Sequence, residues 1–360
     1  MAGYVGPDAL TASDYLFFKH SVKAKMSAGL GAYTVTFTDT PSAPATTHEK
    51  IHFGSSIGST TTYGASSGID WRNTRKEDHA HVFLKNFSGV ILPGSYSRET
   101  NLDRLATAIA GTALHELGHN LGLQHFDAYG LDSIKAPGYG GIVGQQNGSI
   151  MATGATGLTA AERGDPRSFN MLEMLKLEFA DDVAPTLGTT VAETAGPNDT
   201  LATAQAIAGS VMPVTGLSAL NITGSLSSGS DFDLFKFDAV LGSLLTGNVF
   251  ATPFTSGAPT DTFLSLLDST GTLLASNDDI SFTSTSLNGG SGFYSTDSLS
   301  LNFEAGYTGT YYFAIGGAGA GDYQFLVSGL APVPEPATMA LAALGLGAAM
   351  RRRKPRARAS

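Results

Sequence analysis

The sequence HELGHNLGLQH occupies residues 115–125 and ends a longer segment, residues 101–121, in which apolar side chains recur at helical spacing. We predict a helix over this longer segment, with Thr100 as a candidate capping residue at its start. Residues four positions apart lie on the same face of a helix, so His115 and His119 are expected to project side by side. Two imidazoles placed in this way can bind one zinc ion.

The residues that follow this pair predict the rest of a metal site. Gly122 allows the backbone to leave the helix through a positive φ angle, and the turn can bring His125 back as a third nitrogen ligand. Three protein ligands leave one coordination position for water, which is typical of catalytic rather than structural zinc sites. Glu116 is too close to His115 to be a comfortable ligand itself, but it is well placed to contact that water.

The extended pattern HExxHxxGxxH resembles the motif of the metzincin zinc endopeptidases. The resemblance implies a catalytic helix packed on a twisted sheet, with a methionine turn beneath the zinc. Met151, within the sequence Ser-Ile-Met-Ala at residues 149–152, is the candidate methionine. Some metzincins carry a tyrosine two residues later, whereas this chain has Thr153, so the resemblance does not favour the tyrosine-bearing subfamilies.

The segments before the motif supply candidate strands for the sheet that the resemblance implies. Residues 33–38 and 79–85 show strand patterns, and residues 90–92 form a further short candidate. His79 and His81 would point to one face of the second strand. They could hold a second, structural metal if other ligands join them, or they could be ordinary surface residues.

The pattern of the chain changes after residue 185. We predict a helix over residues 171–180, capped by Asn170 and Glu173, at the end of the metzincin-like domain, residues 1–185. Residues 186–198 have the composition of a linker. Short alternating segments with turn residues between them, including a hairpin over residues 263–275, then predict a β-sandwich over residues 199–330.

The sandwich segment resembles the bacterial pre-peptidase C-terminal domain, a β-sandwich that follows many secreted peptidases. The matching sequences are short, and they include residues 198–200, 231–235, 277–279 and 309–312. Their acidic and amide side chains supply the oxygen ligands that calcium prefers, although such residues also favour turns. The candidate calcium ligands are Asp231, Asp233, Asn277, Asp278 and Asp279.

Residues 331–360 form a tail with three parts in order, namely Pro334-Glu335-Pro336, an apolar run over residues 337–350, and a basic cluster that begins at Arg351. This order resembles the PEP-CTERM sorting tail recognised by exosortases in Gram-negative bacteria. The apolar run is shorter than the ~20 residues of a comfortable membrane span, so we expect transient membrane contact with the arginines on the cytoplasmic side. The alternative is a buried helix followed by a solvated tail. Residues 1–30 show no secretory signal, so export implies a start further upstream.

The composition limits the classes of function. The 360 residues are enough for two domains, and the absence of cysteine excludes disulfides, thiolate metal sites and a cysteine nucleophile. The last ten residues hold six of the 21 basic side chains, which leaves 15 basic and 31 acidic residues elsewhere, a net charge of −16. Nucleic-acid binding is disfavoured by such an acidic body.

These observations predict an α+β metzincin-like domain, an all-β sandwich and a short C-terminal apolar helix. The expected function is an exported zinc endopeptidase in which His115, His119 and His125 bind zinc and Glu116 acts as general base towards a protein substrate. An exosortase-like enzyme is the expected processing partner, and the cell surface or extracellular matrix of a Gram-negative bacterium the expected location. The alternatives are an adhesion or matrix protein with an incidental protease fold, and a zinc hydrolase acting on a non-peptide substrate.

Overall fold

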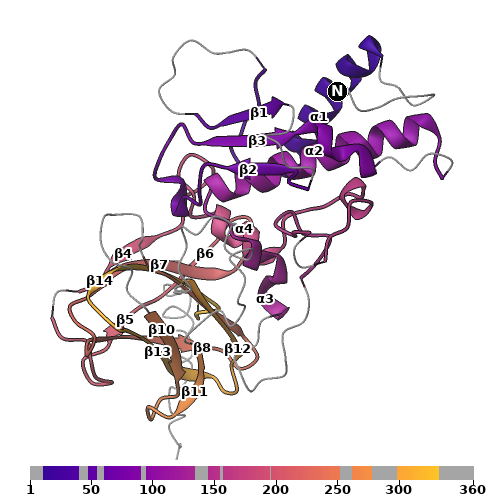
Figure 1. The fold of residues 1–360 in the computed structure, drawn as a ribbon. Helices are drawn as coiled ribbons and strands as arrows, with labels where there is room; N and C mark the ends of the chain where they lie inside the picture. Colours follow the sequence, from indigo (N-terminus) through magenta and orange to yellow (C-terminus); the bar gives the residue numbers. More distant parts are fainter. Residues whose placement is uncertain are drawn as a thin grey trace, which may run out of the picture.

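The computed structural model describes residues 11–39, 48–54, 61–90, 95–133, 145–154, 157–194, 196–251, 262–277 and 298–331. It contains a helical N-terminal part with a small sheet, drawn above a β-sandwich in Figure 1. The predicted apolar helix over residues 337–350 lies outside the described residues. Within the described ranges, the structure has no helix with the length and apolar character needed to cross a membrane.

The small sheet has the strand order β1-β3-β2. β1 (Lys50–Gly54) runs parallel to β3 (His79–Phe83), whereas β2 (Gly64–Ser66) runs antiparallel to it and forms one edge. The strand predicted at residues 79–85 is therefore confirmed over its first five residues. The prediction of a strand at residues 33–38 was wrong, because this segment has no ladder partner and Thr34 N–H instead donates to Val183 O at 3.0 Å.

Leu84 and the residues after it leave the sheet in a 3-10 helix, η2 (Leu84–Val90). Val90 was predicted to begin a short strand, but it ends this helix and its side chain is fully buried. Residues 91 and 92 of that predicted strand lie outside the described part of the chain.

The long helix α2 (Arg98–Asn120) packs between α1 (Ala12–Gly29) and the sheet. The predicted helix is confirmed, but it begins three residues earlier, and the capping residue is Ser97, whose Oγ accepts from Thr100 N–H at 3.2 Å. Ala80 and Val82 of β3 are fully buried in the sheet and Val82 belongs to the same core as α2. α2 is buried along most of its length, so the groups at its C-terminal end are held in a rigid frame.

A short helix, α4 (Met171–Leu177), follows the candidate methionine turn. The predicted capping pair is confirmed, since Asn170 Oδ1 accepts from Glu173 N–H at 3.0 Å and Glu173 Oε2 accepts from Asn170 N–H at 2.8 Å. The helix is shorter than the predicted range 171–180, because the chain turns after Leu177.

The C-terminal part contains two sheets that share one core. One has the order β11-β10-β13-β8-β5, and the other has the order β12-β9-β14-β7-β4 with β6 beside β7. The strands are β4 (Thr190–Ala192), β5 (Gln205–Ala206), β6 (Ser210–Val211), β7 (Ser218–Leu226), β8 (Phe232–Ala239), β9 (Leu244–Ala251), β10 (Thr262–Leu267), β11 (Leu273–Asn277), β12 (Ser298–Glu304), β13 (Gly309–Gly317) and β14 (Gly321–Ser328). The predicted hairpin is confirmed as β10 and β11, and β4 lies in the segment predicted as a linker.

The two parts meet at a small apolar interface. The Trp71 ring stacks on Phe250 of β9 with centroids 4.2 Å apart, and its Nε1–H donates to Gln324 Oε1 of β14 at 3.1 Å. Glu178 of the N-terminal part also accepts from the backbone N–H of Val214 at 2.6 Å. The sandwich is thus joined to the N-terminal part by stacking and by directional hydrogen bonds.

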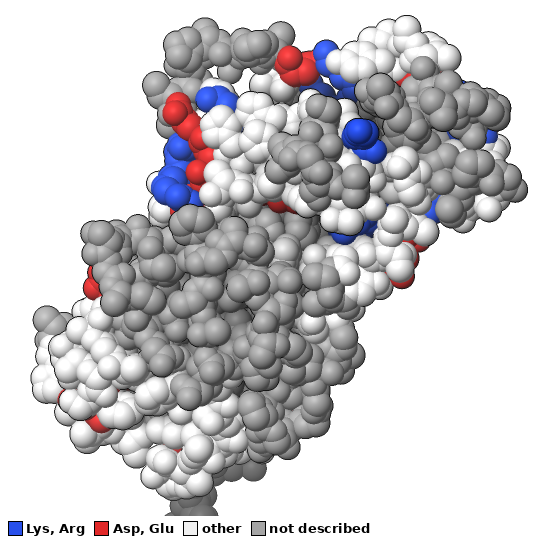
Figure 2. Space-filling view, in the orientation of Figure 1, with Lys and Arg blue, Asp and Glu red and all other residues white. Residues whose placement is uncertain are grey.

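The surface of the N-terminal part carries charges of both signs. In the face shown in Figure 2, blue and red side chains lie next to each other there. Lys76 Nζ, for example, lies 3.2 Å from Asp182 Oδ2, and Lys19 Nζ lies 2.7 Å from Asp39 Oδ2. This mixture matches the balance of acidic and basic residues in this half of the sequence.

Candidate metal centre

Three histidine side chains meet at the C-terminal end of α2. His115 and His119 lie on successive turns, and His125 begins the 3-10 helix η3 (His125–Tyr129). The Nε2 atom of His125 lies 2.9 Å from that of His115 and 3.1 Å from that of His119. The structure therefore brings together the three residues that the sequence predicted as one ligand set, with their ring nitrogens facing a common point.

Gly122 makes this convergence possible. Its φ angle is +94°, and a Cβ atom here would lie 2.8 Å from the Cα atom of Trp71. The backbone turns at this residue, with Gly122 N–H donating to His119 O at 2.9 Å and Leu123 N–H donating to Gly118 O at 2.8 Å. The predicted exit from the helix through a positive φ angle is confirmed.

Backbone carbonyl groups fix the tautomers of the two helical histidines. His115 Nδ1 lies 2.9 Å from Ile150 O, and His119 Nδ1 lies 2.8 Å from Leu123 O. A carbonyl oxygen can only accept, so each Nδ1 carries the hydrogen and each Nε2 keeps its lone pair. Hydrogen bonds of this kind orient metal-binding histidines and raise their basicity as ligands.

The environment of the cluster fits a metal ion better than it fits charged imidazoles. All three rings are almost fully buried. Burial, followed by the neighbouring histidines, lowers the pKa of His115 well below its usual value and that of His119 to about 3. Neutral imidazole is the form that binds metals. Tetrahedral zinc with ligand distances of 2.0–2.1 Å separates its nitrogens by about 3.3 Å, so the rings need to spread by only a few tenths of an ångström.

Glu116 lies beside this cluster and packs against the edge strand. Its side chain is 7% exposed, and a Cβ atom on Gly64 of β2 would lie 2.6 Å from Glu116 Cγ. Burial raises the pKa of the Glu116 carboxyl to about 8, and the positive charges of Arg163 and Arg167 act in the opposite direction. The carboxyl group is thus buried against β2, with the charges of two arginines acting on it.

Met151, the candidate methionine, packs against α2 at Gly118. It is fully buried, and its Sδ atom would be 2.8 Å from a Cβ atom on Gly118, which lies between the two helical histidines. The absence of a side chain at Gly118 therefore allows the methionine to approach this closely. The preceding carbonyl, Ile150 O, accepts from both His115 and Arg167 Nη1, the latter at 3.1 Å.

Glu173 connects the methionine turn to α4. Besides capping α4, its carboxylate accepts from Ser149 Oγ and from Met151 N–H, the latter at 3.2 Å. Glu173 is fully buried, and burial is the main cause that raises its pKa to about 7. One side chain therefore fixes both the turn beneath the histidines and the helix that follows it.

Sequence reasoning missed Gly64, Arg167 and the second role of Glu173. Glu173 was recognised only as a capping partner, because its position three residues after Asn170 is a local signal. Its contact with Met151 spans 22 residues and has no local pattern. Gly64 lies in a three-residue strand that is too short to give a clear alternation.

The sandwich places two of the candidate calcium ligands in one acidic cleft of about 770 Å³. Asp231 and Asp233 line it together with Glu193, and Tyr323 Oη donates to Asp233 Oδ2 at 2.7 Å. Asp233 is almost fully buried. Burial and the adjacent Glu193 carboxyl raise the pKa of Asp233 to about 8. Glu193 belongs to the residues that resemble the pre-peptidase C-terminal domain, but it was not among the candidate calcium ligands.

Asn277 lies elsewhere on the same sheet. The register places Asp233 opposite Ile315, Ile315 opposite Leu264, and Leu264 opposite Asn277. Three strand spacings separate the two residues, which corresponds to about 14 Å. Asp278 and Asp279 lie outside the described residues. Among the described residues, the sets of three metal-ligating side chains with ligand atoms within 4.8 Å consist of histidines.

Comparison with known proteins identifies the C-terminal tail. Residues 332–354 match the PEP-CTERM protein-sorting motif. This motif marks an exported protein that is sorted to the cell surface, and it implies recognition by an exosortase. No curated protein matches the chain.

Several solved structures resemble part of the chain with low scores. The pre-peptidase C-terminal domain of a Bacillus anthracis collagenase is 17% identical, and the match covers 35% of this chain and 92% of that one with a TM-score of 0.23. The periplasmic g-type lysozyme inhibitor PliG of Aeromonas hydrophila is 12% identical, with coverages of 39% and 95% and a TM-score of 0.20. The surface-associated copper-binding protein CorA of Methylomicrobium album BG8 is 10% identical, with coverages of 39% and 97% and a TM-score of 0.13. Scores this low carry no argument about function, and the description of the sandwich rests on its own strand pairing.

Proposed function

We propose that this chain is a zinc-dependent endopeptidase of the metzincin type that acts after export. The observation that carries the proposal is the convergence of His115, His119 and His125 on one point, with Glu116 beside them and Met151 beneath. The burial of the three imidazoles, and the carbonyl groups that orient two of them, support a catalytic metal centre.

The three Nε2 atoms would hold zinc, which would supply the Lewis acidity that polarises a carbonyl and acidifies water. The Glu116 carboxylate would accept a proton from the attacking water as the new C–O bond forms. It would then pass that proton to the amine nitrogen as the C–N bond breaks. Ile150 O and Leu123 O keep two of the rings in the orientation that this chemistry requires.

The position of β2 favours a peptide substrate. β2 pairs with β3 on one side and forms the edge of the small sheet. An extended peptide can add to such an edge through backbone hydrogen bonds. Gly64 of β2 packs against Glu116, so a peptide bound along this edge would pass next to the proposed base. A substrate without a peptide backbone could not form this ladder of hydrogen bonds with an edge strand.

The sorting motif gives the proposed enzyme its location. We infer that the tail delivers the protein to the cell surface, with the exosortase as processing partner. The acidic cleft of the sandwich would bind calcium through Asp231, Asp233 and Glu193, and thereby stabilise this domain.

The proposal is tested with Glu116→Gln and His119→Ala in the full chain. Glu116→Gln should keep zinc, because the three histidines remain, and should lose about 10²–10⁴ in the rate of casein cleavage. His119→Ala should lose both zinc and activity, because two nitrogen ligands hold zinc poorly in an open site. The measurements are zinc stoichiometry and casein turnover for both variants and the parent.

Each other outcome has a defined meaning. A Glu116→Gln protein that cleaves casein at the parental rate would refute the mechanism. Zinc binding by the parent without cleavage of any unfolded protein would favour a non-peptide hydrolase. A parent that neither binds zinc nor cleaves would instead favour a surface adhesion or matrix protein.

A further inference from the structure

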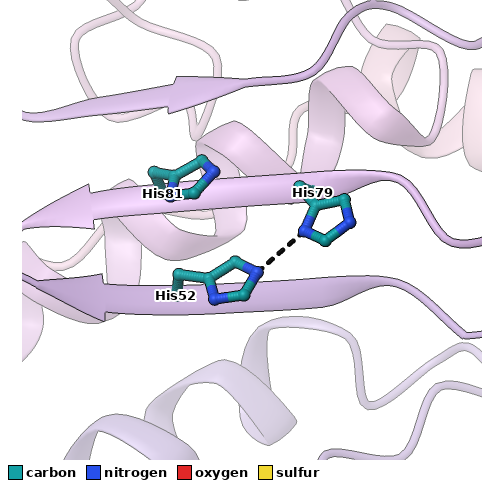
Figure 3. A group of neighbouring side chains, drawn as sticks. All are labelled: His52, His79 and His81. Atoms are coloured by element: carbon teal, nitrogen blue, oxygen red, sulfur yellow. Dashed lines mark hydrogen bonds between the residues drawn. The ribbon is translucent and has the colours of Figure 1, made fainter.

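A second group of histidines lies on the small sheet, away from α2. Figure 3 shows His52 on β1 and His79 and His81 on β3, with all three rings close together. The parallel pairing places His52 opposite His81, and His79 lies two residues earlier on the same face as His81. Ala80, which alternates with them, is fully buried, whereas His52 and His81 are exposed. The group therefore projects from the outer face of the sheet.

The ring nitrogens of this group lie close enough to one another for the three side chains to share one metal ion. One ligand atom from each residue lies within 4.8 Å of the others. His52 Nε2 and His79 Nδ1 are 2.8 Å apart. The His52 ring is stacked on those of His79 and His81, at centroid distances of 5.0 and 4.8 Å and angles of 9° and 15°.

The donor atoms of this group are all imidazole nitrogens. Imidazole ligands without a carboxylate suit zinc, copper and nickel rather than calcium or magnesium.

We propose that His52, His79 and His81 form an exposed binding site for a late first-row divalent metal ion, separate from the buried histidines that meet at the C-terminal end of α2. Binding requires a modest movement, because nitrogens around tetrahedral zinc are about 3.3 Å apart and the His52–His79 separation would widen by about 0.5 Å. Rotation of the exposed His52 ring can supply this change. The remaining coordination positions face solvent.

The ion would join β1 to β3. These strands are paired in parallel over five residues, and two of the ligands lie on one strand and the third on the other. An ion that binds only the folded sheet raises the stability of the fold by mass action. The site is thus expected to support the sheet on which α2 packs, without contacting the proposed catalytic centre.

The test uses the metal-free full chain without a histidine tag and Zn²⁺ as the probe. His52→Ala/His81→Ala should bind one zinc equivalent fewer than the parent and should lose part of the zinc-dependent rise in melting temperature. His20→Ala, which removes an exposed histidine on α1, is the matched control and should behave as the parent. His115→Ala/His119→Ala should retain the exposed site, so this result does not depend on the proposed function.

A Cu²⁺ spectrum provides a second measurement. In the His115→Ala/His119→Ala background, one bound Cu²⁺ should give an electron paramagnetic resonance signal with nitrogen couplings, and further loss of His52 and His81 should abolish it. Unchanged metal stoichiometry in His52→Ala/His81→Ala would overturn the proposal. A Cu²⁺ signal without nitrogen couplings would overturn it as well.

Discussion

At the scale of single residues, the candidate centre depends on two glycines that admit other side chains. Gly118 makes room for the sulfur of Met151, and Gly64 makes room for the Glu116 side chain. In the first contact the glycine is on α2 and the methionine is in a later turn. In the second the glycine is on the edge strand β2 and the glutamate is on α2. Each glycine therefore affects the site through the space that it leaves for the Met151 or Glu116 side chain.

The contact at Gly64 leads to a specific prediction. In Gly64→Ala, the added Cβ would lie within 2.6 Å of Glu116 Cγ, so the carboxyl group must move. We expect casein turnover to fall by about tenfold or more, since proton transfer requires hydrogen-bond geometry, while zinc stoichiometry stays unchanged. Gly54→Ala on β1 is the control, because no atom lies within 4 Å of its added Cβ. Equal turnover in the two variants would show that the Gly64 contact does not position Glu116.

The sequence predicted the ligand histidines because their spacing is local. His119 follows His115 by four positions, and a glycine turn separates them from His125, so helix and turn geometry suggest their convergence. Glu173 and Gly64 could not be found in this way, because their contacts with the site join distant segments and depend on packing. His52 was missed for the same reason, although His79 and His81 were recognised as sharing a face.

At the scale of elements, periodic segments were predicted well and irregular ones poorly. α2 and the β10–β11 hairpin follow from side-chain spacing and turn residues. Residues 33–38 alternate like a strand, yet Tyr33 Oη donates to Met174 O at 2.9 Å and Thr34 bonds to Val183 O. Tertiary contacts with the end of the N-terminal part have replaced the ladder that the local pattern favoured.

The acidic cleft beside β8 predicts a pH-dependent stability of the sandwich. The pKa of Asp233 is raised from 3.8 to about 8, so the folded state binds more protons than the unfolded state between these values. The unfolding free energy should therefore fall as pH rises through this window, by at most about 1.4 kcal/mol per pH unit. Asp231, Asp199, Asp322 and Glu193 also line the cleft and add negative charge.

This prediction can be checked by denaturant unfolding of the full chain at pH 5 and pH 8. Asp233→Asn should reduce the difference in unfolding free energy between pH 5 and pH 8. The amide oxygen of the asparagine can still accept from Tyr323, but the amide does not titrate. Calcium should raise the stability of the parent more at pH 8 than at pH 5, since the carboxylates are then ionised. A parent with the same calcium response as Asp233→Asn at both pH values would remove the calcium assignment.

At the scale of the whole molecule, the contact between the two parts predicts cooperative unfolding. Phe250 is almost fully buried against Trp71, and removal of a buried phenylalanine side chain costs about 3–5 kcal/mol. Phe250→Ala should therefore separate the thermal unfolding of the N-terminal part from that of the sandwich. Phe237→Ala in the sandwich core is the matched control. It should lower stability without separating the transitions, as measured by calorimetry. A single transition in Phe250→Ala would contradict the proposed coupling.

The sorting motif makes a prediction about location. Replacement of Arg351, Arg352 and Arg353 by Ser removes three of the six basic residues in the cluster that is expected to remain on the cytoplasmic side during export. In the native host, the variant should show altered surface retention or altered tail processing. Unchanged mass and unchanged cell fractionation would count against a sorting role for these arginines.

Trp71 is the single tryptophan of the chain, and the structure places its indole between the two parts. All tryptophan fluorescence of the protein therefore comes from this interface. Emission should shift to longer wavelength when water reaches the ring, even if every strand remains paired. Comparison of this shift with circular dichroism during heating would distinguish separation of the two parts from their unfolding, without any added dye.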